Sequence, residues 1–176
     1  PILFNKDRFL SPTKNNGLEP LDVLPSARRL AWWVCENKHE FQAFISNRVK
    51  YPDKCDQCRS LLFRMPEVAA EWHLKKNGAL KAENVTHGSN KRVWWKCKKN
   101  HAWESTINNR VSGYGCPYCA GKRAGNDNNL KKTFPKVASE WHPKKNKDLT
   151  PRDVTPGSGK KVWWICKKEH EWESSI

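Results

Sequence analysis

The 176-residue sequence predicts a tandem array of small α+β units, and three observations lead to that fold class. An eleven-residue pattern occurs three times, as AWWVCENKHEF at 31–41, VWWKCKKNHAW at 93–103 and VWWICKKEHEW at 162–172. Cysteine and histidine recur at fixed spacings around this pattern, and apolar residues alternate through it. With 37% apolar residues and ten tryptophans, the composition suits small units with a few large aromatic side chains and an added crosslink.

The copies divide the chain into two complete repeats and a third that stops halfway. Cys35, Cys97 and Cys166 take the same position in each copy, 62 and 69 residues apart. In every copy an asparagine lies eight residues before a valine, and that valine lies twelve residues before the cysteine. We therefore predict repeat 1 at residues 1–62, repeat 2 at 63–130 and a truncated repeat 3 at 131–176.

A short helix is predicted near the start of repeats 2 and 3. Residues 66–73 begin with proline, which suits the first helical turn, and Val68, Ala69 and Trp72 fall on one face. The same pattern recurs at residues 135–142. The asparagines that precede each valine, which are Asn15, Asn77 and Asn146, are interpreted as helix stops.

A β-hairpin is predicted at the centre of each repeat. In repeat 2, residues 93–97 and 101–107 alternate between apolar and polar side chains around a turn at 98–100. This alternation places Trp95 and Cys97 on the inner face and Trp94 and Lys96 on the outer face. Whether the outer tryptophans belong to the core or stay exposed is left open.

The two junctions between repeats differ in length and composition. The second one, from Cys119 to Pro135, is longer than the first and includes two glycines and the run NDNN. Such a composition is typical of flexible linkers, so a looser hinge is expected there.

The cysteines and histidines form two complete sets of four metal ligands. Their spacing is Cys-x3-His-x15-Cys-x2-Cys in repeat 1 and Cys-x3-His-x14-Cys-x2-Cys in repeat 2. A hairpin turn brings the first pair together, and four protein ligands leave no open position, which is typical of structural zinc. The predicted ligands are Cys35, His39, Cys55 and Cys58 in repeat 1, Cys97, His101, Cys116 and Cys119 in repeat 2, and the half-site Cys166 and His170 in repeat 3.

Disulfides and a redox pair are the competing interpretations of these cysteines. Seven cysteines is an odd number, and the fourth partner in each set is a histidine at a fixed offset, which disfavours disulfides. A redox CxxC motif would not explain the linked Cys-x3-His pair. Three sulfurs and one nitrogen in a small basic unit favour zinc over iron, so we expect two zinc ions in the complete repeats.

Taken together, these motifs resemble a known family. The segments PxVAxEWH, VWWxCKKxHxWE, Asn-Arg and GCPYC are similar to those of probable treble-clef or zinc-ribbon zinc finger domains, over nearly the whole chain. The resemblance implies tandem treble-clef repeats, with the last two ligands at the start of a short helix over residues 116–122. It also implies a family of poorly defined role, sometimes found beside nuclease domains. Repeat 1 departs most, with Phe41 in place of Trp and Asp56-Gln57 in place of Pro-Tyr.

The charge balance favours a polyanionic partner. Lys and Arg outnumber Asp and Glu by 33 to 18, for a net charge of +15. Basic residues on the hairpins could neutralise phosphates while an outward tryptophan stacks on a base, so nucleic acid is expected, with RNA slightly ahead of DNA. The candidate contacts are Arg28, Arg29, Arg48, Lys91, Arg92, Trp94, Lys96, Lys98, Lys99, Arg110, Lys160, Lys161, Lys167 and Lys168. Arg48 and Arg110 have an open alternative, a pairing inside their own unit.

Other functions are kept as alternatives. The repeats could form a scaffold within a ribonucleoprotein or other large assembly, or a targeting module of a nuclease or defence system. An enzyme is not expected, because His73, His87 and His142 form no reactive constellation with their neighbours. No small-molecule substrate or membrane partner is expected, since no run of about 18 apolar residues exists, and reduced cysteines indicate an intracellular compartment.

Overall fold

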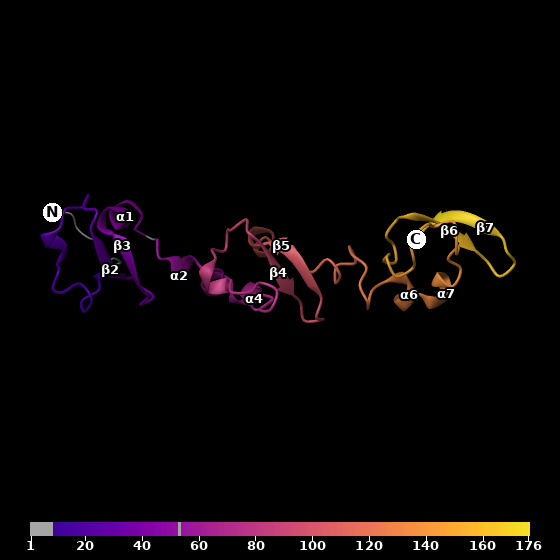
Figure 1. Ribbon diagram of the computed structural model, residues 1–176, viewed down its shortest axis with the longest axis horizontal. Helices are drawn as coiled ribbons and strands as arrows, with labels where there is room; N and C mark the ends of the chain where they lie inside the picture. Colours follow the sequence, from indigo (N-terminus) through magenta and orange to yellow (C-terminus); the bar gives the residue numbers. More distant parts are fainter. Residues whose placement is uncertain (1–8, 53) are drawn as a thin grey trace. The chain divides into compact units, whose positions relative to one another are not determined.

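A computed structural model describes residues 9–52 and 54–176 (Figure 1). These residues form two compact units, one ending at Lys91 and one beginning at Arg92, and each is described by itself. Short helices and three antiparallel β-hairpins make up the described chain, which confirms the predicted small α+β class. No described helix is long and apolar enough to cross a membrane.

The first unit begins with a three-stranded antiparallel sheet. Its strands lie in the order β1 (Phe9–Leu10), β2 (Leu30–Val34) and β3 (Glu40–Phe44). The helices that follow are α1 (Ile45–Lys50), α2 (Asp56–Arg59), α3 (Leu61–Arg64) and α4 (Pro66–Ala69). Two 3₁₀ turns, η1 (Pro20–Asp22) and η2 (Ala82–Asn84), lie in the loops.

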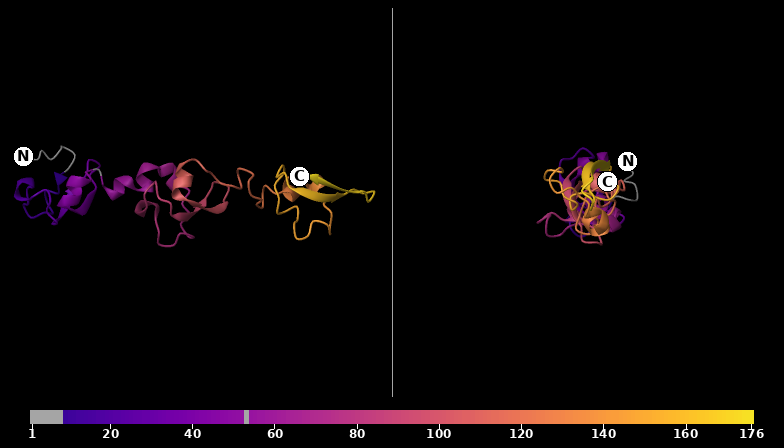
Figure 2. Two further views of the ribbon diagram at one scale, coloured as in Figure 1. Left: turned by 90° about the horizontal axis from the view of Figure 1, so that it is seen from above. Right: turned by 90° about the vertical axis from the view of Figure 1, so that its right-hand side faces the viewer.

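The second unit holds two separate two-stranded sheets. Strands β4 (Arg92–Lys96) and β5 (Ala102–Thr106) are followed by α5 (Ile107–Val111). Helices α6 (Leu130–Thr133) and α7 (Pro135–Ala138) precede the second sheet, formed by β6 (Lys161–Ile165) and β7 (Glu171–Ser175). The β6–β7 hairpin is drawn in yellow, and its turn extends beyond α6 and α7 in Figure 1 and in the left view of Figure 2.

One inner tryptophan anchors each hairpin. Trp33, Trp95 and Trp164 are all buried, in line with the predicted alternation of inner and outer faces. The indole N–H of each donates to a backbone carbonyl ten residues later on the partner strand, at 3.1 Å, 3.1 Å and 3.3 Å. A large ring with a satisfied N–H suits a half-buried hairpin, so the two Trp positions divide into one core and one outer residue.

The apolar clusters around these tryptophans are small. In repeat 1, Ala31, Trp33 and Ile45 form a buried cluster. In repeat 3, Trp164 packs with three buried aliphatic residues, which are Leu130, Val154 and Val162. Clusters of this size supply little stability alone, which is the situation in which small domains depend on metals.

The helices predicted at residues 66–73 and 135–142 are half as long as expected. They end at Ala69 and Ala138, and each follows another one-turn helix that the pattern did not predict, α3 or α6. The side chains of Ser60 and Asn129 cap those preceding helices. In repeat 3 the chain leaves the helix because Trp141 forms a β-bridge with Trp164, so tertiary pairing overrides the helical pattern.

Two of the three asparagines interpreted as helix stops, Asn15 and Asn146, pair with a strand instead. Asn146 accepts a hydrogen bond from the backbone N–H of Trp163 at 2.7 Å and donates to its carbonyl at 2.8 Å. Asn15 makes the same pair of bonds to Trp32, both at 2.8 Å. The side-chain amide thus acts as one residue of an added strand, which satisfies both backbone groups of the outer tryptophan.

The long junction, for which a looser hinge is predicted, carries a set of internal hydrogen bonds. Asn128 donates to the carbonyls of Tyr118 and Arg123 and accepts from the N–H of Gly125. Gly125 lies so close to Tyr118 that an added Cβ would come within 3.1 Å of the ring. Further along, the Thr155 hydroxyl donates to the carbonyl of Gly121 at 2.9 Å, so this segment is fastened at both ends within the second unit.

The asparagine–strand pair yields a first prediction. Replacing Asn146 by Ala leaves the N–H of Trp163 without its partner, at a cost of about 1–3 kcal/mol, while the carbonyl of Trp163 still accepts the backbone N–H of His142. We expect the Trp163 amide to exchange with solvent at least roughly tenfold faster by hydrogen-exchange NMR. Asp148→Ala, an exposed change in the same loop, should leave that amide unaffected. Equal exchange rates in the two variants would contradict the assigned role.

Candidate metal centres

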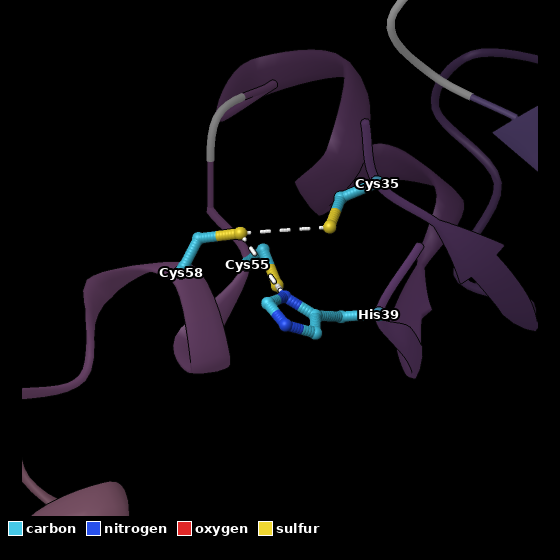
Figure 3. A group of neighbouring side chains, drawn as sticks. All are labelled: Cys35, His39, Cys55 and Cys58. Carbon is cyan, nitrogen blue, oxygen red and sulfur yellow. Dashed lines mark hydrogen bonds between the residues drawn. The ribbon is translucent and has the colours of Figure 1, made fainter. Parts of the chain in front are cut away.

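The four predicted ligands of repeat 1 converge on one point. Cys35 and His39 come from the two ends of the β2–β3 turn, while Cys55 and Cys58 flank the start of α2, and all four side chains point toward one another (Figure 3). His39 Nδ1 lies 3.2 Å from Cys58 Sγ and 3.7 Å from Cys55 Sγ. The sulfurs of Cys35 and Cys58 are 3.5 Å apart.

Repeat 2 places its four ligands in the same arrangement. His101 Nδ1 lies 3.5 Å from the sulfur of Cys97, 3.6 Å from that of Cys116 and 3.4 Å from that of Cys119. Cys97 Sγ and Cys119 Sγ are 3.7 Å apart. In each repeat the four ligand atoms all lie within 4.8 Å of one another.

These distances fit a tetrahedral zinc ion. Zn–S bonds of about 2.3 Å and Zn–N bonds of about 2.0–2.1 Å place the corners of a tetrahedron roughly 3.5–3.8 Å apart. The nitrogen–sulfur distances in repeat 2 match that spacing on all three edges. Three sulfurs and one imidazole nitrogen complete the coordination shell, so both tetrads are suited to structural zinc.

The turn that carries the first two ligands has the same geometry in all three repeats. The N–H of each first cysteine donates to the carbonyl of the histidine four residues later, at 3.1 Å for Cys35, 3.1 Å for Cys97 and 3.0 Å for Cys166. The residue before each histidine has a positive φ: 60° at Lys38, 65° at Asn100 and 63° at Glu169. This tight turn aims the cysteine and histidine side chains to one side.

The electrostatics of the repeat 1 site differ between its cysteines. Burial opposes ionisation of Cys35, but hydrogen bonds from the His39 backbone and from the Cys58 and Cys55 side chains outweigh it and hold the pKa of that thiol below its ordinary value. Burial raises the pKa of the Cys55 thiol to about 12, and the neighbouring Cys35 and Cys58 sulfurs add to the rise. A metal cation at this point would stabilise the thiolate forms of its cysteine ligands, and its binding would release protons.

The second cysteine pair is presented by a single turn rather than a full helix. In repeat 1, α2 starts at Asp56, directly after Cys55, and has four residues. In repeat 2, the helix implied for residues 116–122 is absent, and the chain makes one turn closed by the Ala120 N–H on the Cys116 carbonyl. Gly121, with a φ of 69°, ends that turn.

Repeat 3 has the turn but not the tetrad. Cys166 and His170 occupy the two ends of the β6–β7 turn. Within residues 9–52 and 54–176, no second cysteine pair joins them in a cluster. None of the seven cysteines forms a disulfide, which is consistent with a reducing environment.

Two polar residues that the sequence did not single out lie against the ligands. Asn37 donates from its side-chain amide to the sulfur of Cys58 at 3.3 Å. Asp127, from the junction after Cys119, lies 2.8 Å from Nε2 of His101, and this hydrogen bond lowers the pKa of its carboxyl group. Neither contact has a spacing signal, because both join segments that are far apart in the chain.

This repeated arrangement decides the family. A family model described as probable treble clef zinc finger domain matches residues 8–61, 68–122 and 137–176. The chain belongs to that family. The predicted resemblance is thereby confirmed, with two complete treble-clef sites and an incomplete third. No curated protein matches the chain.

Arg48 of the first treble clef is not available as a phosphate contact. Its side chain is 3% exposed, and its guanidinium lies over the rings of Trp33 and Phe41, 5.5 Å and 5.2 Å from their centroids. It donates to the backbone carbonyl of Pro52. The prediction for Arg48 is therefore wrong, and the alternative of a carbonyl partner inside the unit holds.

The other predicted contacts lie at the surface to different degrees. Trp94 and Arg110 are half-buried. The exposed residues are Arg28 and Arg29 in the first unit, and Arg92, Lys96, Lys98, Lys99, Lys160, Lys161, Lys167 and Lys168 in the second, with Lys91 exposed at the end of the first unit.

The tetrads yield a prediction on zinc content. The full chain should bind two zinc ions, because two sites are complete. Cys97→Ser should reduce the content to one, whereas Cys166→Ser should leave it at two, since the repeat 3 half-site lacks the other ligands. Native mass spectrometry counts the ions directly. A loss of zinc in the Cys166→Ser variant would contradict the assignment.

Proposed function

We propose that this treble-clef array is a nucleic-acid-binding protein whose basic hairpins contact phosphates. The observation that carries the proposal is the β4–β5 hairpin and its approach, which expose five basic side chains around the zinc-bearing turn: Lys91, Arg92, Lys96, Lys98 and Lys99. Within the described chain, only Arg92 of these has an ion pair, a 3.8 Å contact with Glu104. When exposed cations of this kind bind a polyanion, the counterions of the polyanion are released, and this release favours binding.

The outer tryptophans are the candidates for base stacking in the proposed function. In repeats 1 and 3, a lysine ammonium lies over the ring, at 4.5 Å for Lys14 on Trp32 and 4.4 Å for Lys145 on Trp163. Both lysines also pair with a glutamate, Glu40 or Glu171. Trp94 of repeat 2 is half-buried like these two rings, so we assign the stacking role to the part of each outer ring that remains at the surface.

Single-stranded or structured RNA is the favoured partner. The longest helix among the described residues, α1, has six residues, which is too short to read a major groove as a recognition helix does. A basic turn beside an aromatic ring suits unpaired bases better than a duplex. The proposed binding is therefore dominated by phosphates and has little sequence preference.

We propose that the protein acts without catalysis. His142 is buried, donates from Nε2 to Glu171 at 2.7 Å, and accepts the N–H groups of Lys144 and Lys145 at Nδ1. This histidine therefore ties a loop to a strand. His73 and His87 likewise contact backbone groups, the N–H of Lys76 and the carbonyl of Arg59. Four protein ligands in each tetrad also leave no position for a reactive water.

A salt series on matched lysine variants tests the proposal. We expect the full zinc-loaded chain to bind a labelled single-stranded RNA of about 20 nucleotides in fluorescence anisotropy, with affinity falling steeply as salt rises. Changing Lys96, Lys98 and Lys99 together to Ala should weaken binding at least roughly tenfold. It should also reduce the slope of log affinity against log salt by about 2, because about 0.7 is lost for each phosphate contact.

The control changes three exposed lysines away from the hairpin, Lys131, Lys132 and Lys136 on α6 and α7. This variant carries the same net charge as the hairpin variant, so general attraction falls equally in both. Equal slopes for the two variants, or no binding to RNA or duplex DNA, would overturn the proposal. Salt-independent capture of a protein partner would instead favour a scaffold in a larger assembly.

A further inference from the structure

The junction after the second zinc site carries a carboxylate that reaches back to a zinc ligand. Asp127 Oδ1 lies 2.8 Å from Nε2 of His101, while Nδ1 of the same ring faces the three sulfurs of the tetrad. The histidine side chain is 13% exposed, so its ring is largely shielded from water, whereas the aspartate is 46% exposed. One ring nitrogen, Nδ1, therefore faces the metal position, and the other, Nε2, faces the carboxylate of Asp127.

The loop that carries Asp127 is held by side-chain hydrogen bonds. The flanking Asn128 makes three hydrogen bonds to Tyr118, Arg123 and Gly125. Tyr118 lies between the two cysteines of the pair, and its ring is tilted by 33° against that of His101, with the ring centroids 5.1 Å apart. Asn129 then caps α6. The carboxylate is thus held between the second cysteine pair and the first helix of repeat 3.

A carboxylate in this place has a defined chemical effect on a metal-binding imidazole. Nδ1 can donate its lone pair to a metal only when the ring proton sits on Nε2. An anionic acceptor at Nε2 fixes that tautomer, holds the ring plane and increases the basicity of Nδ1. Loss of such a partner typically costs 10- to 100-fold in metal affinity.

We propose that Asp127 is the positioning residue of the repeat 2 zinc site, accepting the Nε2–H of His101 so that Nδ1 binds the metal. Through the same contact, zinc binding holds the junction against the finger, so the segment before repeat 3 is ordered together with the metal. This role concerns the metal site alone and does not depend on nucleic-acid binding. The junction would then support a zinc ligand, a role that its length and its Gly- and Asn-rich composition do not indicate.

Zinc release from the full chain tests the role. The Cys35→Ser change removes the repeat 1 site, so that a chromogenic chelator reports release from repeat 2 alone. In that background we expect Asp127→Ala to release zinc at least roughly tenfold faster. Asp127→Asn keeps a neutral acceptor, so its rate of zinc release should lie between the rates of the Cys35→Ser parent and of Asp127→Ala. Asp127→Glu should restore most of the slow release.

The control is Asp148→Ala, which removes an exposed carboxylate elsewhere in the same unit. We expect its zinc release to match that of the parent. A release rate for Asp127→Ala within twofold of the parent, or an equal acceleration in Asp148→Ala, would overturn the proposal, because Asp127 would then be an ordinary surface ion-pair partner.

NMR of the His101 ring separates positioning from general support of the loop. In the zinc-loaded chain we expect a protected proton on Nε2, shifted downfield by the carboxylate, with zinc on Nδ1. Asp127→Asn should move that proton upfield while mass spectrometry still counts the same number of zinc ions. Zinc on Nε2, or a proton unmoved by the substitution, would contradict the role even if the loop variant released zinc faster.

Discussion

The structure depends on four side chains from two distant segments meeting at one point. In each complete repeat, the hairpin turn supplies a cysteine and a histidine, and a later turn supplies two more cysteines. The apolar cluster of repeat 1 has only three fully buried members, Ala31, Trp33 and Ile45. A core of that size offsets little of the entropy lost on folding, whereas a bound dication joins the segments with energy of the order of a whole small fold. The hairpin and the second cysteine pair are therefore held in register by the ligands more than by packing.

Features with a period or a fixed offset could be predicted from the sequence. The hairpins follow from alternation, because successive side chains of a strand point to opposite faces. The ligand tetrads follow from paired spacings repeated in two copies, which chance does not produce. Trp95 was placed inward on this basis, and it is fully buried. The family assignment rests on the same local signals.

Polar contacts between distant segments could not be predicted in this way. Asn146 marks the end of a helical pattern, yet its amide pairs with a strand 17 residues on, and nothing in the intervening residues signals that. Arg48 is a residue type that commonly contacts phosphate, but here its guanidinium lies over the rings of Trp33 and Phe41. An arginine side chain has enough apolar surface to pack in a core. Asp127 looked like part of a flexible linker, since spacing carries no information about a contact with His101. One-turn helices were missed because four residues are too few to show a helical period.

The metal site and the proposed binding surface share one element, the turn of the β4–β5 hairpin. Cys97 and His101 stand at the two ends of this turn, and the residues between them include the positively charged Lys98 and Lys99. Ligands and cations on one tight turn cannot be positioned independently, because the hydrogen bond between the Cys97 N–H and the His101 carbonyl fixes the backbone for both. A bound zinc ion would also offset the negative charge of the thiolates in the tetrad, which otherwise weakens the positive field of Lys98 and Lys99. A structural metal in this position would therefore affect the proposed binding in two ways. It would fix the shape of the turn, and it would make the surface around the lysines more positive.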